Sequence, residues 1–171
     1  MRRYIIMLII LIFCLILPGT VFHYLSWNGI KPDLAMLWLI YIAIHHRPSE
    51  GVAYGFAMGL IVDLYFSRYI GMYTITLAVV AFLISFLQQR WYRDNIPLTI
   101  VLVFLATLLG QIIVSLLANI AGLNWDLGNA VWMILGTALY NALLVPITYP
   151  LANRSFTLGI LRQKSNYERS Y

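Results

Sequence analysis

Charged residues are scarce in this chain: they make up 10% of its 171 residues, whereas 62% are hydrophobic. A soluble domain needs about 25% charged residues to keep its surface hydrated, so this composition excludes an ordinary soluble domain. The few charges leave long uncharged runs at 4–30, 34–46, 51–62, 69–89, 95–125 and 127–153. A helix needs about 20 residues to cross the roughly 30 Å hydrocarbon core of a bilayer. The sequence therefore predicts a protein whose surface faces lipid.

The chemistry-bearing motifs are also missing. The sequence contains no glycine-rich phosphate loop, no nucleophile elbow and no zinc motif. The single cysteine, Cys14, has no partner for an internal disulfide. His45 and His46 are adjacent, and on a helix their side chains would diverge by about 100°, which makes a poor metal-binding pair. We therefore predict no catalytic residue, no cofactor and no metal site.

The apolar runs predict helices that cross the membrane rather than strands of a barrel, because barrel strands alternate apolar and polar residues over about ten positions. No small-x-small cleavage site follows the first run, so we expect it to be retained as a span. The predicted fold class is an all-α integral membrane protein with a single transmembrane domain over 1–171 and a cytoplasmic tail at 155–171. Its six spans are expected at 4–24, 33–46, 49–66, 70–88, 97–121 and 130–151.

The net charge of +5 follows from this topology. With six spans, nine of the eleven basic residues fall on one side of the membrane, which the positive-inside rule identifies as the cytoplasm. Both termini are then cytoplasmic in a multi-pass protein of the cell membrane, and nucleic-acid binding is not expected. The polar tail would lie free or against anionic lipid headgroups. The nine are Arg2, Arg3, Arg47, Arg90, Arg93, Arg154, Arg162, Lys164 and Arg169, and the other two are Lys31 and Arg68.

The second and third spans are short. The firmly apolar part of the second covers only 34–44, although Asp33 after Pro32 is a good helix start. Two antiparallel helices joined by a tight turn would cross a locally thinned bilayer. A re-entrant pair is the alternative, and it leaves the sides of all other segments unchanged.

The third span carries Gly51, Gly55 and Gly59 at intervals of four, followed by Asp63. Small residues at this spacing let another helix backbone approach closely. One interpretation is a packing seam within the chain. The other is a binding surface for the transmembrane helix of a partner, with Asp63 and Arg68 helping to set its register.

Four charged residues, Lys31, Asp33, Asp63 and Arg68, are expected at the same, outer end of the bundle. An ionisable group within a span is costly and usually faces the protein interior or a functional site. We interpret these residues as a structural charge cluster that closes this end, with a recognition patch for a partner as the alternative. A paired-aspartate intramembrane protease is a weaker hypothesis, because its carboxylates would have to lie deep in the bilayer with access to water.

Polar residues recur every four positions in the fifth predicted span, at Thr107, Gln111, Ser115 and Asn119, and the sixth carries Thr137 and Asn141. Polar side chains on one face avoid lipid and bond to neighbouring helices. We predict a polar interior held by such bonds, with a small solute-binding cavity as the alternative.

The middle of the chain resembles the rod shape-determining MreD family. In that family a basic residue, Pro and Asp or Asn open one helix, as Lys31-Pro32-Asp33 do here. A Gly-x-x-x-Gly-(Leu/Ile)-x-x-Asp helix follows, matched by GFAMGLIVD from Gly55 to Asp63, and then a loop glycine, matched by Gly71. These motifs cover about residues 31–90, and the length and six-span layout match over the whole chain. Ser67-Arg68 depart from the small or polar residues that are common in the family loop.

This resemblance implies a non-enzymatic membrane scaffold of the bacterial cell-elongation complex. Proteins of this kind act beside MreC, which would bind directly. They help to couple cytoplasmic MreB filaments to peptidoglycan synthesis by RodA and a class B penicillin-binding protein. The family fold also resembles the substrate-binding subunits of energy-coupling-factor transporters. That likeness makes a solute- or vitamin-binding subunit the alternative function.

Overall fold

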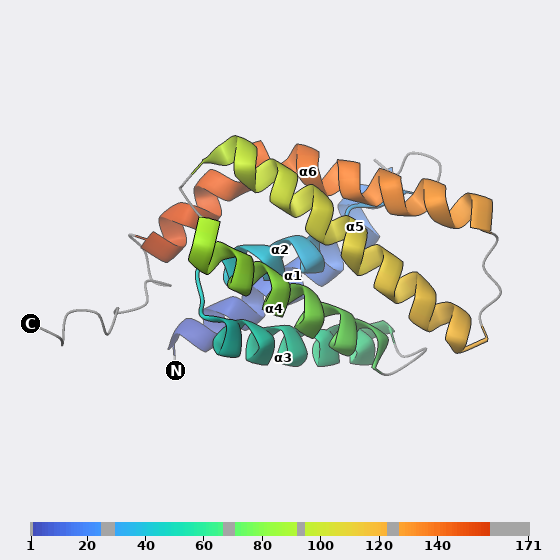
Figure 1. Cartoon of the computed structure of the whole chain (residues 1–171), viewed down its shortest axis with the longest axis horizontal. Coiled ribbons are helices and arrows are strands. Elements are labelled where there is room, and N and C mark those ends of the chain that lie inside the picture. The colour runs from blue at the N-terminus through green and yellow to red at the C-terminus, as the bar shows by residue number, and fades with distance from the viewer. Residues whose placement is uncertain (1, 25–29, 67–70, 92–94, 123–126, 158–171) are drawn as a thin grey trace, which may run out of the picture.

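The computed structural model describes residues 2–24, 30–66, 71–91, 95–122 and 127–157. Arg68 and the tail beyond residue 157 therefore lie outside the described residues. Six α-helices make up the described chain, which confirms the predicted all-α class (Figure 1). They are α1 (Arg2–Tyr24), α2 (Leu34–Ile44), α3 (Pro48–Phe66), α4 (Met72–Trp91), α5 (Ile96–Ile120) and α6 (Leu127–Thr157).

Helix α2 forms the centre of the bundle, and every residue from Ala35 to Ile44 is buried. It contacts each of the other five helices. Its sequence, LAMLWLIYIAI, is apolar on all sides, as expected for a helix surrounded by protein rather than lying on its surface. With 11 residues it is about 17 Å long, too short to cross a bilayer as a helix alone. Its short length is therefore accommodated by burial within the protein.

Two antiparallel helix pairs enclose α2. Helices α3 and α4 form one tightly packed hairpin, and α5 and α6 form the second, with α5 crossing diagonally in front of the bundle in Figure 1. Helix α1 packs against α2 through Met7, Leu11 and Leu15, which lie four residues apart and share one face. The successive helices run up and down, so the N-terminal end of α2 lies beside the C-terminal end of α3.

The outer faces of the bundle are apolar. Large hydrophobic side chains are exposed on all helices except α2, as on Phe13, Phe82 and Leu143. Two segments, Ile96–Ile120 and Ala130–Phe156, are long and apolar enough to cross a membrane by themselves, and Ile5–Pro18, Leu34–Ile44 and Met72–Gln88 are shorter apolar helices. That each of the six helices crosses a membrane stays a prediction.

Candidate functional site

Asp63 holds the start of α4. Its carboxylate is buried, with 2% of the residue exposed. One oxygen accepts hydrogen bonds from the backbone N–H of Gly71 at 2.9 Å and of Thr74 at 2.9 Å, and from the Thr74 hydroxyl at 2.6 Å. The other oxygen accepts from the Tyr73 N–H at 3.0 Å. The first N–H groups of a helix have no partner within the helix and carry partial positive charge. An aspartate at the end of α3 thus satisfies the first turn of α4 and locks the hairpin.

Gly71 completes this turn. Its φ of +111° lies in a region that residues with a Cβ rarely adopt, so glycine is required by the backbone. Its N–H points at Asp63. The aspartate and the loop glycine, noted in the sequence as separate family features, therefore form one structural unit.

Asp33 caps the central helix, as Pro32-Asp33 in the sequence predicted. Its Oδ1 accepts the Met36 N–H at 2.9 Å, and its Oδ2 accepts a hydrogen bond from the Gln111 side chain at 3.0 Å. The side chain of Asn141 binds both polar groups of the Asp33 backbone. The Asn141 side-chain oxygen accepts the Asp33 N–H at 3.0 Å, and the Asn141 amide nitrogen donates to the Asp33 carbonyl oxygen at 3.1 Å. The Asn141 amide also donates to the Thr107 hydroxyl at 3.3 Å. We call these residues of α2, α5 and α6 the Asp33 junction.

The Asp33 junction supplies what the non-helical backbone before α2 needs. Backbone away from regular structure must find hydrogen-bond partners if it lies at membrane depth. Asn141 is fully buried and provides both a donor and an acceptor to one residue. The junction thus ties the start of α2 to the α5–α6 hairpin. The polar residues of the fifth and sixth predicted spans suggested hydrogen bonds between helices. The bonds from Gln111 to Asp33 and from Asn141 to Thr107 are of this kind.

The four expected charges do not form an ion-pair cluster among the described residues. Each aspartate is held by uncharged donors: Asp63 by the start of α4, and Asp33 by Met36 and Gln111. Lys31 makes no ion pair with either one in the described structure. Both aspartates lie near Tyr73: Asp63 accepts the Tyr73 N–H, and Asp33 lines the same cavity as Tyr73. Arg68 is outside the described residues.

The glycine stripe of α3 faces α4. A Cβ built on Gly55 would lie 2.6 Å from the Leu77 carbonyl oxygen, and one on Gly59 would lie 2.4 Å from the Thr74 Cα. At Gly51 the nearest atom is the Ser85 hydroxyl oxygen at 2.3 Å. At Gly55 and Gly59 the backbone of α4 leaves no room for a side chain, so these two glycines permit the close contact of α3 with α4. Docking of a partner helix on this face would require α4 to move away.

The predicted polar face of α5 reaches the interior only in part. Gln111 joins the Asp33 junction, but Asn119 is exposed and Ser115 is half-buried. The assignment of Asn119 to the polar interior was therefore wrong. The physical reason is that each four-residue step turns about 40° around a helix, so eight residues after Gln111 the face has turned by about 80°. Thr107, the first residue of the same row, is also part of the junction.

A cavity of about 470 Å³ lies beside the Asp33 junction, and we call it the Lys31 cavity. All six helices contribute to its wall, and so does the segment before α2. Its polar wall residues are Lys31, Asp33, Tyr65, Tyr73, Gln111 and Thr137. The rest of the wall is apolar and comes mainly from α1 and α2.

The opposite end of α2 is held by aromatic and histidine contacts. The Nδ1 atoms of His45 and His46 each lie 2.7 Å from a backbone carbonyl oxygen one turn earlier, those of Tyr41 and Ile42. The His45 ring stacks on Phe156 of α6, with centroids 4.5 Å apart. The two histidines thus fasten the C-terminal end of α2 to its neighbours. The sequence offered no signal for this role beyond their position at a helix end.

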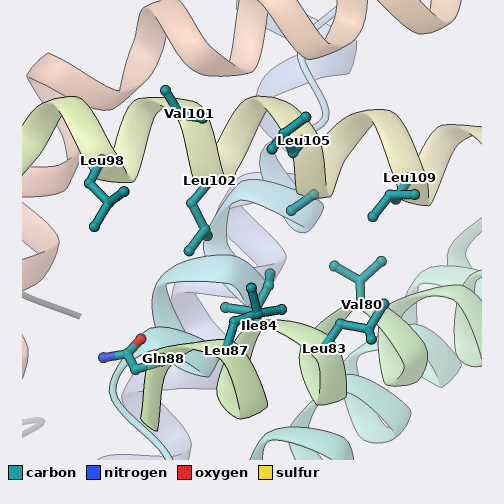
Figure 2. Close-up of a pocket in the computed structure, with 11 residues that line it drawn as sticks. Val80, Leu83, Ile84, Leu87, Gln88, Leu98, Val101, Leu102, Leu105 and Leu109 are labelled. Atoms are coloured by element: carbon teal, nitrogen blue, oxygen red, sulfur yellow. The ribbon is translucent and has the colours of Figure 1, made fainter. Parts of the chain in front are cut away.

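A second hollow is an apolar groove of about 310 Å³ between α4 and α5 (Figure 2). Leu83 and Leu87 line it from α4, and Leu98, Leu102 and Leu105 line it from α5. Gln88 lies at one end, and its buried side-chain oxygen has no hydrogen-bond partner among the described residues.

The architecture and these sites define a helical membrane-type bundle whose buried polar groups serve to join helices. The family model described as rod shape-determining protein MreD matches residues 1–155 of the chain. The chain belongs to the MreD family, a family of membrane proteins that act in rod shape determination. No curated protein and no solved structure matches the chain.

Proposed function

We propose that this protein is a non-enzymatic membrane scaffold of the bacterial cell-elongation complex. Membership of the MreD family supports the role in rod shape. In this proposal all six helices cross the cell inner membrane, and both termini are cytoplasmic, as the distribution of basic residues favours. The central segment reaches far enough for this, because residues 30–33 are non-helical and add up to about 13 Å to the roughly 17 Å of α2.

The observation that carries the non-enzymatic assignment is the engagement of Asp63. Both of its oxygens are occupied by four donors of one helix start, so the carboxylate is committed to holding the α3–α4 hairpin. A protease of the paired-aspartate type needs two carboxylates that share a proton and reach water. Asp33 accepts one hydrogen bond on each oxygen and keeps further acceptor capacity, but a proton-sharing pair also needs the carboxylate of Asp63, which is committed.

The direct partner in this proposal is the single transmembrane helix of MreC. Through MreC, the complex would couple MreB filaments to peptidoglycan synthesis by RodA and a class B penicillin-binding protein. Because α4 covers the glycines, we propose that Gly51, Gly55, Gly59 and Asp63 act indirectly, by building a rigid hairpin that presents an outer surface. Arg68, which lies outside the described residues, stays a proposed contact residue for MreC.

The outer surface proposed for MreC is a stripe on α4. It consists of Ile75, Val79, Phe82 and Phe86, which are exposed. Their spacing of four, three and four residues is that of a helix–helix seam. Phe82 and Phe86 stack at 6.1 Å between ring centroids, which gives the stripe a stiff aromatic end.

Disulfide cross-linking tests this assignment. Replacing Cys14 with serine removes the only cysteine, so that single cysteines can be placed at Val79 or Phe82 and paired with cysteines along the MreC helix. We expect cross-links that recur every three to four residues of MreC. Leu143→Cys on α6 and Phe13→Cys on α1 are matched controls, since both side chains are exposed and apolar. Efficient cross-linking at a control position and none on α4 would place MreC elsewhere.

The Lys31 cavity favours the second candidate function, a solute- or vitamin-binding subunit of a transporter. A scaffold needs no cavity lined by both charged and polar groups. The two functions are distinguished in cells: loss of rod shape without a transport defect on depletion supports the scaffold. An uptake defect that precedes the change of shape supports the transporter.

A further inference from the structure

The Lys31 cavity has the size and composition of a ligand site. Its volume of about 470 Å³ lies within the roughly 300–1,000 Å³ typical of small-molecule pockets. Its wall combines apolar side chains of α1 and α2 with a small number of polar groups. A mostly apolar wall with a few convergent polar groups is the pattern by which pockets orient a ligand.

The cavity contains one charge of each sign. Lys31 has no hydrogen-bond or ion-pair partner among the described residues, although its ammonium group can donate three hydrogen bonds. Asp33 accepts one hydrogen bond on each oxygen, from Met36 and from Gln111, so each oxygen keeps a free acceptor position, and the residue lines the cavity. Leaving such groups without partners next to a membrane interior is costly.

We propose that the Lys31 cavity binds a zwitterionic group that carries a primary amine and a phosphate or carboxylate. The anion pairs with the ammonium of Lys31, and the amine donates to the carboxylate of Asp33. The Thr137 hydroxyl supplies a further hydrogen bond, and the ring of Tyr65 or Tyr73 offers a face to the amine. A purely anionic ligand would be repelled by Asp33, and a neutral one would leave Lys31 unpaired. This inference does not depend on the binding of MreC.

Two sources carry this chemistry: the headgroup of an ethanolamine phospholipid and a free amino acid. The apolar wall beside the charges fits the glycerol and upper acyl region of a lipid. The lipid arm of the test uses delipidated protein in nanodiscs of phosphatidylethanolamine or phosphatidylglycerol with identical acyl chains, with bound lipid counted by native mass spectrometry. The soluble arm titrates glycine and phosphoethanolamine calorimetrically.

We expect the wild type to retain one phosphatidylethanolamine and to prefer it over phosphatidylglycerol. Lys31→Met should weaken that retention about tenfold or more, the effect of losing one charge-assisted hydrogen bond. Thr137→Val, which keeps the side-chain shape, should weaken it by a smaller factor. Arg154→Gln is the control, because Arg154 is exposed at the other end of α6 and lies outside the cavity wall.

The outcomes separate cleanly. The site belongs to a free solute if glycine or phosphoethanolamine binds saturably, Lys31→Met abolishes that binding, and the protein shows no preference between the two lipids. The proposal is overturned if wild type, Lys31→Met and Thr137→Val retain both lipids to the same extent and neither glycine nor phosphoethanolamine binds. Should Lys31→Met fail to insert or fold, Thr137→Val alone decides, since Thr137 makes no hydrogen bond in the described structure. Cross-linking to MreC is unaffected by any of these results.

Discussion

Removing the charge of Asp63 is the sharpest test of how this bundle is held together. Asparagine has the same shape but only one acceptor oxygen. If that oxygen takes the position that binds Gly71 and Thr74, the amide group then points its own N–H at the N–H of Tyr73. The variant therefore loses one charge-assisted hydrogen bond and the attraction between a carboxylate and a helix start.

The magnitude follows from these two losses. A hydrogen bond to a charged group contributes about 1.5–3 kcal/mol, and a negative charge at a partly buried helix start contributes up to about 2 kcal/mol. Asp63→Asn should therefore lower the free energy of unfolding by about 2–4 kcal/mol. Asp63→Ala leaves four donors without an acceptor in a buried position and should cost more, at least about 4 kcal/mol.

The chain provides its own probe for the assay. Cys14 is the only cysteine and is partly buried in α1, so a thiol-reactive dye reports its exposure as the bundle melts in detergent. The expected order of melting temperatures is wild type, then Asp63→Asn, then Asp63→Ala. Glu50→Gln, a carboxylate in the first turn of α3, is the control for a general charge effect. If Asp63→Ala melts like the wild type but no longer binds MreC, the aspartate is a contact residue and the structural account is wrong.

Further predictions concern the glycine seam and the Asp33 junction. Gly55→Ala should destabilise the protein by more than about 2 kcal/mol, because the added Cβ would overlap the Leu77 backbone. Gly128→Ala is the control: the added Cβ meets no atom within 4 Å, so the change should be neutral or stabilising by up to about 1 kcal/mol. Equal melting temperatures for the two alanine variants would contradict the packing of α3 on α4. Asn141→Leu should cost about 3 kcal/mol by leaving the Asp33 backbone unsatisfied, whereas Asn119→Leu should change stability by less than about 0.5 kcal/mol. A similar loss for both asparagine variants would show that Asn141 is not specifically required at the junction.

Part of this site was predictable from local pattern. Asp33 after Pro32 indicated a helix start, and the capping bond to Met36 confirms it. Gly55 and Gly59 indicated close helix approach, because the absence of a side chain has that consequence in any fold. Asp63 marked a special position, since a buried charge within an apolar run must be compensated. In each case the inference needed only the residue and its neighbours in the chain.

The partners of these groups were not predictable. Asp63 was expected among Lys31 and Arg68 because opposite charges attract, yet it binds uncharged N–H groups that lie 8, 10 and 11 residues ahead. The pairing of Asn141 with the Asp33 backbone joins positions 108 residues apart. Asn119 has the same chemistry as Asn141 but faces outward, because the face that carries Gln111 has turned by about 80° eight residues later, and only the packing of α5 decides which residue of that row points inward.

The sequence by itself determined that the chain is all-α, that its surface is apolar, and that it belongs to the MreD family, because composition, run length and a local motif suffice for these. The tertiary structure alone decided that the 11-residue α2 is a buried central helix, that α4 occupies the glycine face, and that a cavity with one cation and one anion lies at the end of α2. The reason is that scarce polar groups in an apolar chain must find partners. Which partner each one finds depends on helix packing, which no single segment encodes.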